Sequence, residues 1–517
     1  MRMVFLKAVV LSFACFVLGA ASSPAAPGNE GENAGTSRYE EYILTPAPGP
    51  EPHINGPKVF GARPGRPFIY RIPCTGERPM TFSAEGLPPG LALDGTTGII
   101  TGNVPAQRGN YDIVLKAANG HGSDSRILRL IVGDKLALTP PMGWNDWYIH
   151  YDRVTEKHMR DAADAMVESG LADVGYMYVN IDDCWMKKRG DTPYRDKDKA
   201  VLPNEKFPDM KGMVEYIHSK GLRAGLYTSP GEWTCAGYAG SYYHEAEDAK
   251  KFAEWGFDFL KYDWCSYMIR GIGRKDFARP YIKMGKLLDS LDRDIVFNLC
   301  QYGMGDVWEW GAKAGGHSWR TTGDLGLEGN KDLPGFYYIG LKNAQHDEYA
   351  GPGGWNDPDY LLIGWVGDAR GMGEGKPTTL TPDEQYSYMS LWSLMAAPLI
   401  FSGDMAKLDP FTLNVLGNPE VIEVDQDPLG RQGRIVRQAG DSLVMAKPME
   451  DGSLAVGLFN LGKDEMNISV TWDELGLAGE QLARDLWRRK DIGTFGEEFA
   501  SPVPKHGVTL IRFRKAD

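Results

Sequence analysis

Four aspartates at the ends of strand-like segments are the residues of this chain best suited to chemistry. Parallel strands can bring several such ends to one pocket. Gathering buried anions is costly unless each has a partner or a function. A single acid at a strand end is as readily explained as the cap of the next helix. As a set, the four indicate a polar pocket, and they are Asp182, Asp183, Asp263 and Asp324.

Two cations accompany these acids in the sequence. Lys261 stands two residues before Asp263, so both side chains point to the same side of a strand. Arg320 stands four residues before Asp324, at the end of another strand-like segment. We therefore expect the two cations to act as partners of the acids.

Two carboxylates suit the cleavage of a glycosidic bond. One ionised acid attacks or assists at the anomeric carbon, and a second acid protonates the leaving oxygen. The second acid needs a raised pKa, which burial and neighbouring negative charge supply. The sequence shows no zinc-type spacing of Cys and His, and no Gly-x-Gly-x-x-Gly follows the first strand. We therefore expect neither a metal nor a cofactor.

The elements that must position these residues alternate between strand and helix over residues 136–424. A helix is predicted to begin at Thr155, which is a good N-cap. This alternation predicts a (β/α)₈ TIM barrel as the catalytic domain, with an open doubly wound sheet as the alternative. The strands expected to end at polar residues cover 176–181, 223–227, 258–262, 295–299, 318–322 and 398–401.

Two β-domains are expected to flank the barrel. Short β-type runs separated by Gly and Pro turns over residues 54–133 predict an N-terminal Ig-like β-sandwich, and part of this segment resembles an immunoglobulin-like domain of secreted bacterial enzymes. Short strands over residues 425–517 predict a C-terminal antiparallel β-sandwich. Residues 22–53, rich in Pro, Gly, Ala, Ser and Glu, are expected to form a flexible leader.

The N-terminus and the composition bear on location and partners. Residues 1–21 combine positive charge, a short apolar run and small residues, so they predict a signal peptide and export to the periplasm or the extracellular space. No later segment of the 517 residues predicts a membrane span. The net charge of −13 disfavours nucleic acid as a partner. The sequence leaves the oligomeric state open, a homo-oligomer included.

Six ordered motifs resemble glycoside hydrolase family 27, which includes the melibiases (α-galactosidases) and the α-N-acetylgalactosaminidases. The resemblance implies a (β/α)₈ barrel, a C-terminal β-sandwich and net retention at the anomeric carbon. The motifs cover Thr139–Trp147, Ile181–Trp185, Leu260–Asp263, Gly351–Asp359, Met395–Leu399 and Asp425–Gly430.

The resemblance also assigns roles to residues. It places the nucleophile at Asp263 and the acid/base at Asp324, and it implies that Asp182 and Asp183 hold O6 and O4 of galactose. The other positions that it places around the substrate are Trp147, Tyr227, Lys261, Gln301, Arg320 and Asp359.

The cysteines and two departures from the family pattern complete these expectations. Cys235 and Cys265 match a family disulfide that stiffens the pocket wall, whereas Cys184 lacks its family partner and is expected to stay unpaired. Gln301 stands where relatives often have Glu, near C2 of the sugar. Trp264 follows the nucleophile where Gly or Asn is common, and we expect it to reshape the pocket rim.

The expected activity is hydrolysis of terminal non-reducing α-D-galactosyl residues of oligo- or polysaccharides by double displacement. An α-N-acetylgalactosaminidase would need small residues near C2, which Gln301 is not. A β-L-arabinopyranosidase would have no C6 hydroxymethyl group to recognise, and the intact pair Asp182 and Asp183 disfavours it. A secreted carbohydrate-binding protein without catalysis is the alternative from another class.

Overall fold

The computed structural model describes residues 39–268, 273–325, 333–367 and 375–516. The predicted signal peptide, residues 1–21, and the first part of the predicted leader lie outside the described residues. Within the described ranges, no helix has the length and apolar character needed to cross a membrane.

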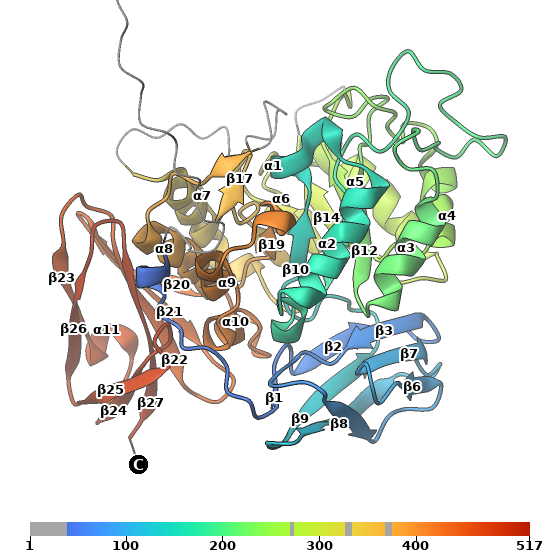
Figure 1. The fold of residues 1–517 in the computed structure, drawn as a ribbon. Coiled ribbons are helices and arrows are strands. Elements are labelled where there is room, and N and C mark those ends of the chain that lie inside the picture. The colour runs from blue at the N-terminus through green and yellow to red at the C-terminus, as the bar shows by residue number, and fades with distance from the viewer. Residues whose placement is uncertain (1–38, 269–272, 326–332, 368–374, 517) are drawn as a thin grey trace, which may run out of the picture. The chain divides into compact units, whose positions relative to one another are not determined.

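Eight parallel strands form one sheet at the centre of the fold (Figure 1). The two ends of this sheet meet at Leu361 and Phe401, which form a parallel bridge, and the backbone N–H of Leu361 donates to the Ile400 carbonyl. The predicted (β/α)₈ barrel is confirmed. The strand order is β16 (Trp355–Asp357), β15 (Ser318–Arg320), β14 (Val296–Cys300), β13 (Phe259–Asp263), β12 (Arg223–Thr228), β11 (Tyr178–Asn180), β10 (Met142–Asn145), β19 (Leu399–Phe401).

Helices follow the strands and cover the outside of the barrel (Figure 1). Helix α2 (Glu156–Glu168) begins as predicted, because the Thr155 side chain accepts a hydrogen bond from the His158 backbone N–H. Helix α8 (Pro382–Leu394) is buried on nearly every side and contacts the C-terminal domain as well as its helical neighbours. The remaining helices include α1 (Trp147–His150), α3 (Met210–Ser219), α4 (Glu245–Trp255), α5 (Arg274–Asp289), α6 (Val307–Trp310), α7 (Gly335–Asn343), α8 (Pro382–Leu394), α9 (Pro410–Leu416) and α10 (Pro419–Asp425).

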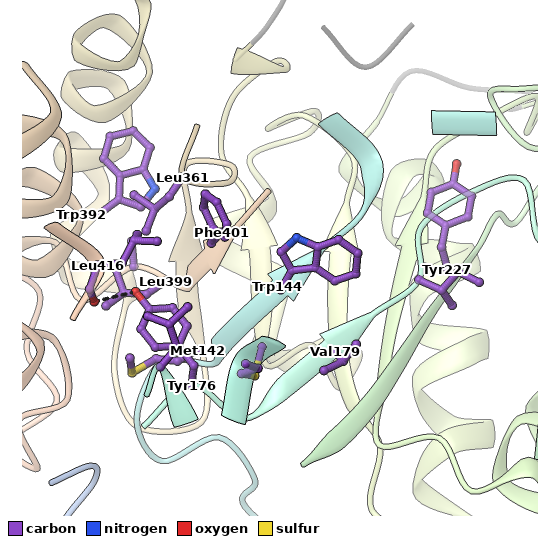
Figure 2. Close-up of a cluster of buried hydrophobic side chains, with 14 of the residues drawn as sticks. Met142, Trp144, Tyr176, Val179, Tyr227, Leu361, Trp392, Leu399, Phe401 and Leu416 are labelled. Carbon is purple, nitrogen blue, oxygen red and sulfur yellow. Dashed lines mark hydrogen bonds between the residues drawn. The ribbon is translucent and has the colours of Figure 1, made fainter. Parts of the chain in front are cut away.

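Large apolar side chains fill the barrel and the layer beneath its helices (Figure 2). Trp144 of β10 is fully buried, and its indole N–H donates to the Gly403 carbonyl at 2.8 Å. The Tyr176 hydroxyl donates to the Leu416 carbonyl at 3.1 Å and so links the start of β11 to helix α9. Close packing of this kind leaves the strands little freedom, so the polar residues at their ends have fixed directions.

The N-terminal domain consists of two small sheets around a common apolar core, which contains Phe68, Ile100, Ile113 and Leu130. This arrangement confirms the predicted Ig-like sandwich. One sheet has the order β2 (Val59–Ala62), β9 (Gly122–Val132), β8 (Gly109–Asn119), β5 (Thr81–Glu85), the other β3 (Pro67–Arg71), β7 (Ile99–Asn103), β6 (Leu91–Leu93), and β1 (His53–Ile54) pairs with β4 (Cys74–Thr75).

The C-terminal domain is antiparallel, as predicted, with a core that includes Val444, Val456, Val470 and Phe513. The short helix α11 (Trp472–Leu475) interrupts its strands. One sheet has the order β20 (Arg434–Ala439), β21 (Ser442–Pro448), β22 (Leu454–Asn460), β27 (Val508–Lys515), β24 (Gln481–Asp485), β25 (Lys490–Phe495), and β23 (Met466–Thr471) pairs with β26 (Glu498–Val503).

The described end of the predicted leader, residues 39–53, is held in place. The Thr45 hydroxyl donates to the Trp487 carbonyl at 2.9 Å, and the Leu44 backbone N–H donates to the Tyr386 hydroxyl at 3.1 Å. This part of the segment is therefore anchored to helix α8 through the backbone of Leu44 and to the C-terminal domain through the side chain of Thr45.

One arginine of the N-terminal domain is bound by the barrel. The Arg63 Nε atom lies 2.6 Å from the Asp294 carboxylate, and the Arg63 backbone N–H donates to the same carboxylate at 2.9 Å. Its guanidinium also donates to the carbonyls of Asp289 and Arg293. Both partners of the ion pair are buried, so the contact is a charge-assisted one shielded from water.

Candidate active site

Asp182, just beyond strand β11, accepts hydrogen bonds from three side chains. The donors to its Oδ2 atom are Lys261 Nζ at 2.8 Å, Asn145 Nδ2 at 2.9 Å and the Tyr360 hydroxyl at 3.1 Å. Lys261 points to the same pocket as Asp263, as its position on β13 predicts, but its ion pair is with Asp182. The sequence did not identify Asn145 or Tyr360 as site residues, although each lies in or next to a quoted motif.

Asp183 faces the loop between β12 and α4. Its carboxylate accepts the backbone N–H of Ala236 at 3.0 Å and that of Cys184 at 2.7 Å. Burial raises the pKa of Asp183 to about 7, although hydrogen bonds from Thr234, Ala236 and Cys184 act to lower it. Asp183 therefore ties the pocket to that loop.

Asp263 ends strand β13 and is held by two phenols. The Tyr302 hydroxyl donates to Oδ1 at 2.6 Å, and the Tyr227 hydroxyl donates to Oδ2 at 3.2 Å. Burial raises the pKa of Asp263 to about 6, although the charge of Lys261 and the hydrogen bond from Tyr302 act to lower it. A buried carboxylate with both oxygens occupied by donors has a fixed orientation.

Tyr302 is the site residue that sequence reasoning missed most clearly. It lies two residues beyond Cys300, the end of strand β14, and it has a φ of +65°. This left-handed conformation is uncommon for a bulky residue. It forms a turn that brings the phenol back to Asp263. The one sequence signal was its position after a strand end.

Arg320 joins the two remaining carboxylates. Its guanidinium lies 3.2 Å from Asp324 and 3.2 Å from Asp359. Asp359 is almost fully buried and also accepts the Leu325 backbone N–H at 2.9 Å, so it fixes the residue that follows Asp324. Burial raises the pKa of Asp359, although the charge of Arg320 opposes this effect.

Asp324 differs from the other acids in its exposure. Its side chain is 32% exposed, whereas that of Asp359 is 1% exposed. The expectation that burial surrounds the acid/base is wrong for this residue, because it lies beyond the end of β15 rather than on the strand. Its open position leaves room for a proton to pass to or from a bound molecule.

A disulfide joins Cys235 to Cys265, as the resemblance implied. The two sulfurs and a carboxylate oxygen of Asp263 lie within 4.8 Å of one another. The Tyr227 hydroxyl lies 3.4 Å from the Cys265 sulfur. The pair thus forms a covalent wall beside Asp263, and its oxidised sulfurs are not available as thiolate ligands for a metal. Cys184 is a buried free thiol, as expected.

Three other predicted residues have distinct surroundings. The Trp147 ring lies over the Lys261 ammonium at 6.0 Å. Gln301 is fully buried, and neither its Oε1 nor its Nε2 atom has a hydrogen-bond partner among the residues that the structure describes. The Trp264 indole packs against Tyr281 of helix α5 at 6.1 Å. Its ring therefore packs onto a barrel helix, although Trp264 directly follows Asp263 in the chain.

A barrel whose strand ends gather carboxylates with Lys, Arg and Tyr donors has the parts that define a glycoside hydrolase. Family comparisons agree with this class. The family model described as alpha galactosidase A matches residues 139–427, that of the alpha galactosidase C-terminal beta sandwich domain matches 439–513, and an Ig-domain model matches 51–133. The chain belongs to the alpha-galactosidases of glycoside hydrolase family 27.

Individual relatives extend over most of the chain. An alpha-galactosidase of Cyamopsis tetragonoloba is 39% identical over 389 residues, which are 74% of this chain and 88% of the relative. Alpha-galactosidase A of Cellvibrio japonicus is 36% identical over 73% of this chain and 93% of the relative. A solved Bacteroides fragilis structure, of an alpha-galactosidase/melibiase candidate, has a TM-score of 0.84 and 37% identity and covers 92% of this chain and 100% of its own.

Proposed function

We propose that the chain releases terminal non-reducing α-D-galactosyl residues from oligo- or polysaccharides with net retention, using Asp263 as nucleophile and Asp324 as acid/base. The observation that carries this assignment is the contrast between the two acids. Asp263 is buried and held by two phenols, whereas Asp324 is partly open and, among the side chains that the structure describes, is held by Arg320 alone. A nucleophile needs a fixed orientation, and a proton donor needs access to the leaving oxygen.

In the first step, an Asp263 oxygen attacks the anomeric carbon while Asp324 gives its proton to the departing glycosidic oxygen. The bond from the anomeric carbon to that oxygen breaks, and a galactosyl ester on Asp263 forms. The hydrogen bonds from Tyr302 and Tyr227 keep the carboxylate directed into the pocket.

In the second step, Asp324 acts as a base. It takes a proton from water, the water oxygen attacks the anomeric carbon, and the ester bond to Asp263 breaks. Galactose leaves, and both acids return to their starting protonation states. Two inversions at one carbon give net retention.

Recognition of galactose is assigned to the group around Asp182 and Lys261. A buried acceptor and a buried cation can pair with the axial O4 and with O6, and an epimer of the wrong configuration would leave them without a partner. Asp183, fixed by the Ala236 N–H, completes this side of the pocket. The same preference disfavours a β-L-arabinopyranoside, which has no O6.

The Asp263→Asn variant tests the assignment. We expect it to fold and to lose about four orders of magnitude in kcat on para-nitrophenyl α-galactoside. The Asp324→Asn variant should lose much less on this activated substrate than on melibiose, whose leaving group needs protonation. Asp198→Asn, at a side chain that is 69% exposed, is the matched control and should keep full activity. Near-normal turnover by Asp263→Asn would refute the proposed nucleophile.

We also propose that the protein is exported. The signal-like residues 1–21 and the disulfide between Cys235 and Cys265 support this, because disulfides persist in oxidising compartments. Fractionation of cells that make the full chain, with N-terminal sequencing of the product, should give a processed chain outside the cytoplasm. An unprocessed cytoplasmic chain would refute it.

A further inference from the structure

A second cavity is lined in part by the loop that also forms the wall of the catalytic pocket. This loop, residues 229–244, carries Ala236, which binds Asp183, and Cys235 of the disulfide. The cavity has a volume of about 430 Å³, within the range of about 300–1,000 Å³ that is usual for small-molecule sites. Aromatic side chains are prominent in its lining, which includes Tyr194, Trp233, Tyr242, Tyr243 and His244.

Ring contacts connect this cavity to Trp264, the residue that follows Asp263. The rings of Tyr243 and Tyr242 are 4.1 Å apart, those of Tyr242 and Tyr267 are 6.0 Å apart, and those of Tyr267 and Trp264 are 5.3 Å apart. Trp264 directly follows Asp263 in the chain. These rings form a row, which we call the aromatic row, from the cavity to Trp264, whose own ring packs against Tyr281 of helix α5.

The outer end of the aromatic row is presented to solvent. Tyr243 is 76% exposed, which is unusual for a large ring on a soluble surface. Its φ of +64° is a left-handed conformation that bulky residues rarely adopt. Such outliers concentrate at functional positions because the surrounding structure must enforce them. Tyr243 is therefore held outward by the loop rather than left there by default.

The polar groups of the cavity indicate a neutral, hydroxyl-rich ligand. The Arg195 charge is already neutralised by an ion pair with the buried Asp248 at 2.6 Å. Glu232 adds a carboxylate to the lining, which disfavours an anionic glycan. The Nδ1 atom of His244 is buried and has no hydrogen-bond partner within the described part of the chain. Flat rings with a few such groups suit the face and the hydroxyls of a pyranose.

We propose that this cavity and the aromatic row bind sugar units on the leaving-group side of a neutral oligo- or polysaccharide while its terminal galactosyl residue occupies the catalytic pocket. The inference rests on the proposed function. Asp182, Asp183 and Asp263 are buried in the barrel mouth, so the rest of the substrate must extend outward from Asp263. The loop of residues 229–244 borders both sites, because its Ala236 binds Asp183 and its Trp233 and Tyr243 line the cavity.

The test compares a short substrate with a long one. Tyr243→Asn removes the ring and leaves a residue that tolerates the left-handed conformation, so the fold is preserved. We expect kcat/KM on galactomannan to fall by about three- to tenfold, the value of one lost ring contact, and kcat/KM on para-nitrophenyl α-galactoside to stay unchanged. A Tyr242→Ala/Tyr243→Asn double variant should deepen the loss on galactomannan alone.

Tyr338→Ala is the matched control. This tyrosine on helix α7 is 43% exposed and does not line the cavity, so its loss should affect neither substrate. Unchanged galactomannan kinetics in both cavity variants, or an equal loss on the aryl substrate, would overturn the inference. Failure of the proposed function would instead appear in the wild-type chain, as absence of turnover of the aryl galactoside.

Discussion

The Lys261 ammonium and the Asp182 carboxylate form an ion pair of 2.8 Å in which neither side chain is more than 9% exposed. Burial disfavours the charged form of Lys261, but the charge of Asp182 opposes this effect and the pKa of Lys261 is raised. Each of the two buried charges is therefore stabilised by the other. The pair is at once part of the fold and part of the pocket.

Removing one partner of this pair should destabilise the protein. We expect Lys261→Met to lower the free energy of unfolding by about 3–5 kcal/mol, because Asp182 is left as an uncompensated buried charge. Denaturant titration at neutral pH measures the change. The Lys261→Met/Asp182→Asn double variant should regain most of the stability but no activity. A single variant as stable as the wild-type chain would contradict the prediction.

Removing the Tyr302 hydroxyl should change the pH profile. The hydrogen bond to Asp263 favours its ionised form, so its loss in Tyr302→Phe should raise the pKa of Asp263 further above 6. The acid limb of the kcat/KM profile should move to higher pH by about one unit. Tyr227→Phe, whose hydroxyl is 3.2 Å from the carboxylate rather than 2.6 Å, should give a smaller shift. Equal effects in both variants, or none, would count against a special role of Tyr302.

Ionisation of Asp263 should cost stability at high pH. Its pKa in the folded protein, about 6, exceeds the ordinary value of 3.8. The favourable contribution of Asp263 to the free energy of unfolding is therefore complete below pH 3.8, and it is lost as the pH rises through 6. Asp263→Asn should be more stable than the wild-type chain by about 3 kcal/mol at pH 8 and should lose this advantage near pH 4. Melting temperatures at both pH values measure it, and a pH-independent difference would contradict the sign.

We expect the buried Gln301 amide to lower the free energy of unfolding and to contribute to substrate binding. Its buried amide has no partner in the described structure, so an apolar residue of similar shape removes a desolvation penalty. We expect Gln301→Met to raise the free energy of unfolding by about 1 kcal/mol and to raise KM on aryl α-galactosides. Ala478→Met, at an exposed loop position, is a control for the added methionine. A destabilised variant with unchanged KM would show that the amide serves the fold instead.

Most of the barrel could be predicted because its strands end in recognisable polar residues. Thr155 caps helix α2 as the cap rule requires, and the strand that ends at Asp263 has the expected position. Strands β10 and β16 were not predicted as strands. They have only three or four residues and are buried on both faces, so they show no alternation of polar and apolar residues.

The site was less predictable than the fold, because its contacts depend on how loops turn. The catalytic roles proposed for Asp263 and Asp324 came from the family resemblance rather than from spacing. The partner of Lys261 could not be predicted, since Asp182 is distant in sequence and lies beyond the end of β11, which β12 separates from β13 in the sheet. Tyr302 reaches Asp263 only through a left-handed turn, which no local pattern specifies.

The contact of Arg63 with Asp294 bears on how far this chain is modular. An accessory domain that can be exchanged between enzymes in evolution should leave its neighbour complete when it departs. Here the departure of the N-terminal domain would strip a buried carboxylate of its guanidinium and leave several carbonyl groups of the barrel without their donors. The domain is therefore an integral part of the scaffold. A barrel recombined without it would keep Asp294 but lack the arginine that pairs with this carboxylate.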